Sequence, residues 1–511
     1  MTSAVSFEPL QIETTKKLTW MHYFKFFIYG LLLPLGFAPF HIPGMAILGL
    51  ALFYYGLCAH SKGSGFLRGL FFGLGFFGFG VSWIYVSIYE YGHLNPVLSG
   101  LITLLFILYL SFFPALLALV FNVFSTKRPT MTSGLFFSAL WVISEFLRAS
   151  ILSGFPWLLL GFGQFDAPVK YLLPVLGVYG ASFLTVFAAT LLVCAFSVEK
   201  RKQLTYLVLF VSAILAPLAL KPIEWVHISN TPVSIGVIQA NLSMRDKWDE
   251  TLFWKLLDRY QKDVISLLGT QLIVMPESAI PLPSSYISDF LDDLREKAKN
   301  AGSGILLGIP EPTKIDADDY FNALISLGEA QGFYLKQHLV PFGEYIPGIF
   351  QPLMNWLQIP DANLKPGKNL QSLIRVHKHP VATLICYELA YGELLRKQFP
   401  HAEWIVSISD DGWFGHSLAM YQQQQIAQVR SLQTGRYQVV SNNDGLSSVI
   451  NTRGDIVTSL PAFNAGLLRA SIYPATGSTP WVLLGDWPIL ILSFGIFLGA
   501  MISGFPKKQH Q

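Results

Sequence analysis

The charged residues of this 511-residue chain are distributed very unevenly, and this distribution constrains the fold more than any motif does. Of the 67 charged residues (35 Lys and Arg, 32 Asp and Glu), 14 lie within 18–220 and 46 lie within 221–480. The whole chain is 13% charged, whereas a soluble protein carries roughly 25%. We therefore expect a membrane domain over 1–220, a soluble domain over 221–480, and a membrane return with a tail over 481–511.

Apolar segments that could cross a bilayer, which takes roughly 20 residues, recur along the membrane parts of the chain. We predict eight spans, at 22–40, 43–59, 66–88, 97–124, 132–150, 172–197, 203–220 and 481–504. Basic residues are concentrated on one side of these spans: Lys16, Lys17, Lys25, Lys62, Arg68, Lys127, Arg128, Lys200, Arg201, Lys202, Lys507 and Lys508. By the positive-inside rule, both termini are then cytoplasmic and the soluble domain lies outside.

The soluble part reads as a layered α/β domain, because strand-like runs first alternate with helix-like segments and later cluster. Strands are predicted at 233–239, 272–275, 304–309, 322–327, 333–340, 373–376, 381–386, 404–409, 438–442 and 446–450. Helices are predicted at 249–268, 287–300 and 419–434.

Cys386 stands at the end of the buried-strand pattern 381–386. A lone cysteine is most often a small core residue. Cys58 and Cys194 fall inside predicted spans, however, so Cys386 has no disulfide partner in the external domain. An unpartnered thiol in an exported domain is a candidate nucleophile.

Two further charged residues, Glu277 and Lys336, also lie at or near the ends of predicted strands. A cysteine reacts as the thiolate, so a carboxylate base and a cation beside the developing negative charge would complete a working set. Individually such residues are usually solvated charges, and spacing alone does not bring them together. His338 and His416 are other candidates for the base, without an advantage of position.

Three segments carry a family resemblance: Met275-Pro276-Glu277-Ser278, the run Lys-Gln-His-Leu-Val-Pro-Phe-Gly-Glu-Tyr-Ile-Pro over 336–347, and Ile385-Cys386-Tyr387-Glu388. They resemble the Glu-Lys-Cys signature of the nitrilase superfamily. With Ser-Asp-Asp-Gly-Trp-Phe-Gly at 409–415 and the eight spans, the whole chain resembles the bacterial apolipoprotein N-acyltransferases. This resemblance implies a nitrilase-like αββα sandwich in the periplasm, carried on a multi-pass helical body in the inner membrane, and it favours a monomer.

The resemblance also implies an activity and a set of roles. A glycerophospholipid, typically phosphatidylethanolamine, would donate an acyl chain to the α-amino group of the diacylglyceryl-cysteine that begins an apolipoprotein, without a cofactor or metal. Cys386 would be the nucleophile, Glu277 the base and Lys336 the oxyanion stabiliser. Glu344 and Glu388 would be supporting acids, and the substrate-binding residues would be Tyr387, Trp413, Phe414, Trp248 and Trp157.

One position departs from the family pattern: Asp410 stands where the family commonly has asparagine. A carboxylate there still accepts hydrogen bonds but loses the amide donor. Asp410, Asp411 and His416 match no common metal-site spacing.

Several other features have two readings. Glu145 and Arg148 share a helix face and are expected to form a structural pair. Trp157 is also typical of an interfacial anchor. The apolar segment 349–357 is either core or a membrane-contacting lid over the site.

Alternative functions remain open at this stage. A membrane-anchored amide hydrolase would use the same three residues with water as acceptor, although one span would suffice to anchor it. A transporter or receptor is disfavoured because the spans show no line of intramembrane charges. Nucleic acid is not an expected partner, since no basic stripe is interleaved with aromatic residues.

Overall fold

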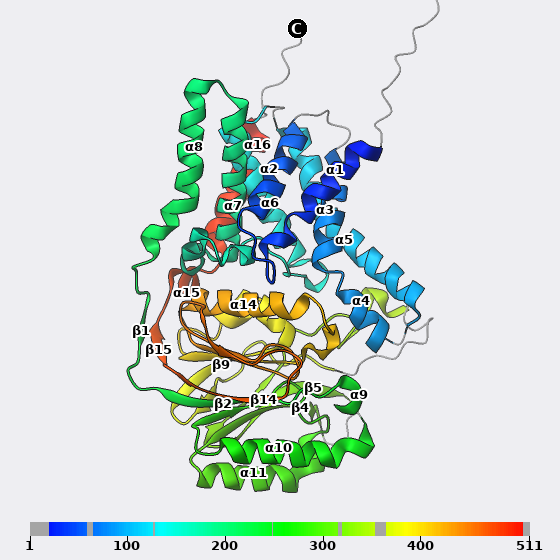
Figure 1. The fold of residues 1–511 in the computed structure, drawn as a ribbon, viewed down its shortest axis with the longest axis vertical. Helices are drawn as coiled ribbons and strands as arrows, with labels where there is room; N and C mark the ends of the chain where they lie inside the picture. Colours follow the sequence, from blue (N-terminus) through cyan, green and yellow to red (C-terminus); the bar gives the residue numbers. More distant parts are fainter. Residues whose placement is uncertain are drawn as a thin grey trace, which may run out of the picture.

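A computed structural model describes residues 20–58, 65–92, 94–125, 128–247, 249–314, 319–352 and 364–503. A bundle of helices forms one end of the molecule and two stacked β-sheets form most of the other (Figure 1). The first and last helices lie in the same bundle, so the chain leaves the bundle, builds the sheets and returns.

Helices occupy all eight predicted spans. They are α1 (Trp20–Leu31), α2 (Met45–Cys58), α3 (Gly65–Gly80) with α4 (Ile84–Val86), α5 (Pro96–Phe124), α6 (Met131–Arg148), α7 (Leu173–Ser197), α8 (Lys200–Leu215) and α16 (Trp487–Ser503). Among the described residues, three segments are long and apolar enough to cross a membrane: Pro96–Phe124, Pro168–Ser197 and Lys200–Leu220. A fourth is the pair Gly65–Gly80 and Ile84–Tyr91, bent by 65°. The segments Met45–Cys58 and Trp487–Ile502 are apolar but shorter.

Glycines allow the helices of the bundle to approach closely. A Cβ at Gly69 of α3 would lie 2.2 Å from the carbonyl oxygen of Pro114 in α5, and one at Gly75 would lie 2.0 Å from that of Phe27 in α1. Such distances exclude any side chain, so α3 can pack against both neighbours only with glycine at these positions.

The soluble domain contains two large sheets and a small one. The six-stranded sheet has the order β14 (Gly466–Ile472), β2 (Val233–Gln239), β3 (Leu272–Val274), β4 (Gly304–Pro312), β5 (Tyr320–Gly328), β7 (Phe333–Leu335). The seven-stranded sheet has the order β13 (Ile456–Ser459), β12 (Ser448–Ile450), β11 (Gln438–Asn442), β10 (Trp404–Ser409), β9 (His379–Ile385), β8 (Ile374–Val376), β6 (Ala330–Gln331). β1 (Val226–Ile228) pairs with β15 (Ala475–Gly477) where the chain enters and leaves the domain.

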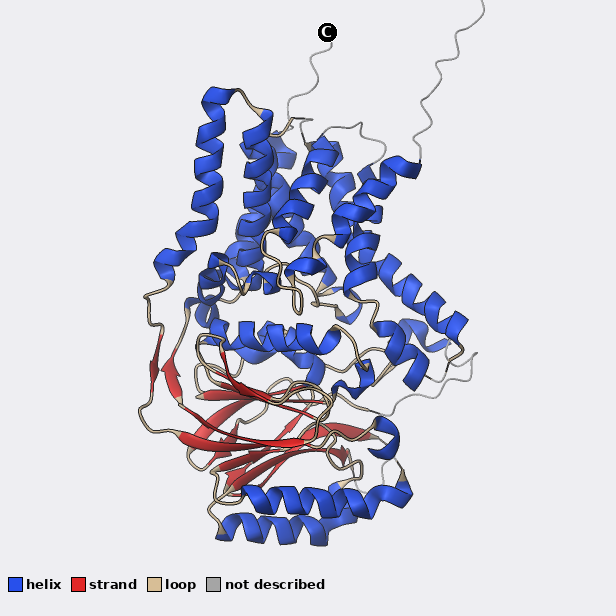
Figure 2. Cartoon of the chain, viewed as in Figure 1, coloured by secondary structure: helices blue, strands red, loops and turns tan. Residues whose placement is uncertain are grey.

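Helices cover both outer faces of the stacked sheets, which gives the expected αββα order (Figure 2). α10 (Phe253–Leu267) and α11 (Ser288–Asn300) pack on the six-stranded sheet through a buried apolar cluster that includes Leu256 and Leu294. A second cluster fills the space between the sheets. α14 (Ala419–Thr434) covers the seven-stranded sheet, and the described part of the chain also has the short helices α9 (Met244–Lys247), α13 (Gly392–Arg396) and α15 (Pro480–Leu484).

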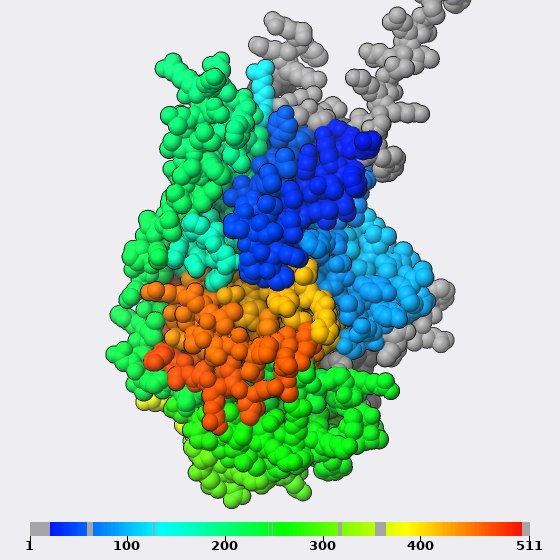
Figure 3. All heavy atoms as spheres, in the orientation of Figure 1, coloured from blue at the N-terminus to red at the C-terminus, as the bar shows by residue number. Residues whose placement is uncertain are grey.

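α14 is buried on nearly all sides because it lies between the sheet and the helical body (Figure 1). Its glutamines form hydrogen bonds toward both neighbours. Gln422 accepts from the indole N–H of Trp83 at 3.1 Å, and Gln425 accepts from the backbone N–H of Ala38 at 3.2 Å. Gln423 and Gln424 donate instead to the sheet, to Ser409 and Ser448. On the face shown in Figure 3, the orange C-terminal strands lie between the blue N-terminal helices and the green part of the chain that holds α10 and α11.

Two differences from the predicted elements matter for the site. The strand predicted over 333–340 ends at Leu335, so Lys336 lies just beyond a strand rather than inside one. The segment 466–472 was not predicted as a strand, yet it forms β14 along the edge of the six-stranded sheet, paired with all of β2. The burial of β14 does alternate, but the sequence hides this pattern because Leu467 is an apolar residue on the exposed side.

Candidate active site

The three residues predicted to act together follow three different strands at one end of the sandwich. Glu277 comes three residues after β3, Lys336 directly after β7, and Cys386 directly after β9. β3 and β7 belong to the six-stranded sheet and β9 to the seven-stranded sheet, so both sheets contribute to one site. All three side chains are buried.

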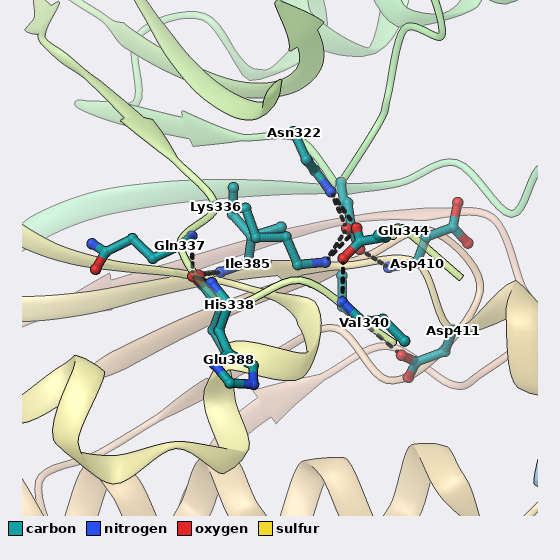
Figure 4. Close-up of polar contacts among 12 residues, drawn as sticks. Asn322, Lys336, Gln337, His338, Val340, Glu344, Ile385, Glu388, Asp410 and Asp411 are labelled. Carbon is teal, nitrogen blue, oxygen red and sulfur yellow. Dashed lines mark hydrogen bonds and ion pairs between the residues drawn. The ribbon is translucent and has the colours of Figure 1, made fainter. Parts of the chain in front are cut away.

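The ammonium group of Lys336 contacts two carboxylates (Figure 4). Its Nζ lies 3.2 Å from Oε1 of Glu277 and 2.8 Å from Oε1 of Glu344. Burial disfavours the charged ammonium, but the charges of Glu277 and Glu344 outweigh it and hold the pKa of Lys336 well above its ordinary value. Lys336 is therefore a permanent cation inside the site.

Asn322 at the start of β5 links the same two carboxylates. Its side-chain N–H group donates to Oε1 of Glu277 at 2.7 Å and to Oε1 of Glu344 at 3.2 Å. The other oxygen of Glu344 accepts from the backbone N–H of Val340 at 2.7 Å. Sequence reasoning missed Asn322, because an asparagine at a strand start looks like an ordinary turn residue and only the folded sheet brings it to Glu277.

The backbone of Cys386 has φ +54°, an uncommon value for a residue with a side chain. Burial raises the pKa of its thiol well above the ordinary value, and the charge of Glu277 adds to this effect. Lys336 and a hydrogen bond with Ser409 act in the opposite direction. The resting thiol is therefore protonated and needs a base to react, while a cation is already in place to stabilise negative charge.

Glu388 joins the segments that carry Lys336 and Cys386. Its carboxylate accepts from the backbone N–H groups of Gln337 at 2.6 Å, His338 at 3.1 Å and Ile385 at 2.9 Å (Figure 4). The phenol of Tyr334 donates to both of its oxygens. Burial raises the pKa of Glu388 to about 7, against the lowering effect of these backbone donors.

Asp410 and Lys247 lie on the other side of Glu277. The backbone N–H of Asp410 donates to Oε2 of Glu277 at 3.1 Å, and the Asp410 carboxylate contacts Nζ of Lys247 at 2.5 Å. The Lys247 ammonium also donates to the backbone carbonyl of Glu277 at 3.1 Å. Lys247 is a second residue that the sequence analysis missed, since one lysine in the charged run 245–250 looks solvent-exposed.

The predicted substrate-binding residues differ in their exposure and in the residues they pack against. The ring of Tyr387 stacks on Trp157 at 6.4 Å, and its hydroxyl donates to the carbonyl of Gly154. Trp413 is 40% exposed and lies against Tyr91, while Phe414 packs edge-on against Trp83. Trp248 lies outside the described residues.

Trp157 is not the interfacial anchor that its position in the sequence suggested. Its side chain is 3% exposed, and its indole N–H donates to Gln422 of α14 at 2.7 Å. The residue therefore lies at the contact between helical body and soluble domain, beside the residue that follows Cys386. The loop containing it folds inward because its backbone is bonded by buried side chains of α6.

Those side chains are Glu145 and Arg148, which the sequence predicted to pair with each other. Among the described residues they form no ion pair with one another. Glu145 accepts from the backbone N–H of Leu160 at 2.7 Å, and Arg148 donates to the carbonyls of Phe155 at 2.7 Å and Trp157 at 2.6 Å. The proposed lid is only partly described: Ile349 is 72% exposed, and 353–357 lie outside the described residues.

Comparisons with known proteins agree with both halves of the molecule. The family described as "Apolipoprotein N-acyltransferase N-terminal domain" matches residues 29–191, and the family described as "Carbon-nitrogen hydrolase" matches residues 234–479. An apolipoprotein N-acyltransferase of Coxiella burnetii is 37% identical over 91% of this chain and 96% of its own. Those of Methylococcus capsulatus and Pseudomonas paraeruginosa are each 34% identical, over 91% and 94% of this chain and 93% and 96% of their own lengths. The chain belongs to the apolipoprotein N-acyltransferase family.

Proposed function

We propose that this chain transfers an acyl chain from a glycerophospholipid, such as phosphatidylethanolamine, through a Cys386 thioester to the α-amino group of the N-terminal diacylglyceryl-cysteine of an apolipoprotein. The observation that carries this proposal is the buried contact of Lys336 with Glu277 and Glu344, in electrostatic contact with the Cys386 thiol. A thiol, a carboxylate and a fixed cation are the groups that acyl transfer through a thioester requires.

In the first half-reaction, Glu277 takes the proton of the Cys386 thiol. The thiolate attacks the ester carbonyl carbon, a C–S bond forms, and the negative charge on the carbonyl oxygen is stabilised by the ammonium of Lys336. The ester C–O bond then breaks, and the departing lysophospholipid oxygen receives the proton from Glu277. Glu344 keeps Lys336 in place through the 2.8 Å contact.

In the second half-reaction, the α-amino group of the apolipoprotein attacks the thioester carbon. A C–N bond forms, Glu277 takes a proton from the nitrogen, and the C–S bond breaks. The proton returns to the Cys386 sulfur. Two half-reactions through one covalent intermediate predict ping-pong kinetics.

The membrane arrangement belongs to the same proposal. Eight spans would place both termini in the cytoplasm and the domain over 221–480 in the periplasm. Both substrates carry acyl chains, so both could reach the active site from the bilayer. Helices at all eight predicted positions support this arrangement, and so does the concentration of basic residues on one side. We further propose a monomer, with the segment 349–357 as a lid that keeps water from the thioester.

Intact-protein mass spectrometry tests the reaction. We expect wild-type protein incubated with phosphatidylethanolamine, without acceptor, to gain one acyl mass that Cys386→Ala does not gain. A diacylglyceryl-cysteine peptide should discharge the adduct and itself gain the acyl chain. Discharge by water with the peptide unmodified would instead support the amide-hydrolase alternative, and the absence of an adduct on the wild type would overturn the proposal.

A further inference from the structure

Asp410, the position at which the chain departs from its family pattern, has a carboxylate surrounded by hydrogen-bond donors. Oδ2 accepts from Nζ of Lys247 at 2.5 Å. Oδ1 accepts from the backbone N–H of Gly412 at 3.2 Å and from the side-chain amide of Asn443 at 3.1 Å. An asparagine here would direct its NH₂ group at one of these donors, so the site as built fits a carboxylate and not an amide.

Lys247 in turn requires an anion. Its side chain is 1% exposed, and a buried ammonium without a counter-charge is strongly unfavourable. Asp410 supplies the only ion pair that Lys247 makes among the described residues. The two residues therefore depend on each other, and removing either one leaves the other as an isolated buried charge.

The pair also joins a separate segment to the base. Lys247 is the last residue of α9, and it donates to the backbone carbonyl of Glu277 at 3.1 Å. Asn443 connects the same segment from the other side, because its side chain bonds both Leu242 and Asp410. The stretch 241–247 is thus attached at two points, and both converge on Asp410.

Other acidic and phenolic groups surround Asp410, so the positive charge of Lys247 is needed beside it. Acidic and phenolic groups face Asp410 from several elements: Asp411 of η12 (Asp411–Phe414), Asp444 of the β11–β12 loop, Tyr91 of η3 (Ser87–Tyr91) and Tyr260 of α10. Lys336, Glu344 and Cys386 face Glu277 from the opposite side. Burial, together with the charge of Asp410, raises the pKa of Asp411 to about 7 and that of Asp444 to about 8.

We propose that Lys247 and Asp410 are a charge-matched pair of positioning residues, which holds the segment 241–247 against Glu277 and so fixes the position of this base. This inference rests on the proposed function only in assigning the base to Glu277. Without Lys247, the backbone carbonyl of Glu277 loses its donor, and Asp410, whose backbone N–H donates to the Glu277 carboxylate, loses its ion-pair partner.

A double-mutant cycle tests the pair. We compare wild type, Lys247→Met, Asp410→Asn and the double variant by the rate of Cys386 acylation with phosphatidylethanolamine, measured from pH 5 to 9. Each single substitution should lower the rate at least tenfold, and the double variant should be no slower than the slower single one, because residues in direct contact do not act additively.

Two further variants keep the result interpretable. Lys247→Arg retains the charge and should recover most of the rate lost in Lys247→Met. Lys262→Met removes an exposed lysine with a carboxylate partner on α10 and should match the wild type. Rate losses that multiply in the double variant, or a Lys247→Arg variant as slow as Lys247→Met, would overturn the inference. Failure of the wild type to acylate would instead count against the proposed function.

Discussion

Two buried groups of charged residues lie on either side of the contact between helical body and soluble domain, and they use the same residue types differently. In the soluble domain, Lys336 directly contacts the carboxylates of Glu277 and Glu344. In the body, Glu145 and Arg148 both bond the backbone of the loop over 155–160. Charge is thus concentrated next to the thiol in the first group and used to shape a loop in the second.

The comparison teaches that burial of charge alone does not identify the chemical site. What distinguishes the group at Lys336 is a cation in contact with carboxylates and in electrostatic contact with a nucleophile. The group at Glu145 acts on the site indirectly, because its loop carries Trp157, which stacks on Tyr387 next to Cys386. The hydroxyls of Tyr387 and Tyr391 also donate to the carbonyl of Gly154 in the same region.

The largest effect should come from the nucleophile. Cys386→Ala should lower acyl transfer by about 10⁴-fold or more, since covalent catalysis is lost together with the leaving thiolate. The same variant should keep a thermal unfolding midpoint close to that of the wild type, because a small side chain is replaced by another. Activity is measured as peptide acylation, and a residual rate within tenfold of the wild type would place the nucleophile elsewhere.

Lys336→Met should come next, with a loss of about 10³-fold in the acylation rate through removal of the cation beside the developing oxyanion. The substitution also removes the cation that the buried carboxylates of Glu277 and Glu344 both contact. Lys262→Met serves as the control. A loss confined to the Michaelis constant for the phospholipid would contradict a role in the transition state.

The sequence predicted the location of those candidate residues that lie just beyond the end of a strand. The positions of Glu277 and Cys386 follow from short apolar runs, and a run that ends in a polar residue marks the edge of a sheet. Lys336 was named as a candidate before the resemblance, but its place beyond β7 was not predicted, because the apolar residues after it continue the strand pattern. Asn322 and Lys247 were missed, since their partners are distant in sequence and each looks ordinary alone.

The structure of the helical body was also only partly predictable from the sequence. Hydropathy located all eight helices, yet only three or four segments of the described chain are long and apolar enough to pass as spans, and two other apolar helices are shorter. Glu145 and Arg148 interact through their charges and have a structural role, as predicted, but they make no direct ion pair, because spacing along a helix gives proximity and not orientation. Here the competing partners were backbone groups of an inward-folded loop.

Arg148→Met should lower the acylation rate less than the substitutions at Cys386 and Lys336, and it should also lower stability. It leaves the carbonyls of Phe155 and Trp157 without their buried donor, at about 1–3 kcal/mol for each unsatisfied group. The thermal unfolding midpoint should fall, and the acylation rate should drop about tenfold without a change in its pH profile. Arg201→Met, which changes an exposed arginine of α8, is the control. A shifted pH profile would mean that the body cluster takes part in the chemistry.

Substitution of Glu388 should have the smallest effect, and this residue shares features with both groups of charged residues. Like Glu145 it accepts from backbone N–H groups, but it lies in the chemical site, and burial raises its pKa from 4.5 to about 7. Between these values the native state holds a proton that the unfolded chain has released, so the stability it contributes is present below pH 4.5 and is lost as pH rises to about 7.

The unfolding midpoint of the wild type should therefore fall more steeply across this window than that of Glu388→Gln, which cannot titrate. Asp411 and Asp444 contribute slopes of the same sign in both proteins, so the difference between the two curves isolates Glu388. Parallel curves would mean that Glu388 stays ionised throughout, held by its backbone donors as Glu145 is bonded by the N–H of Leu160.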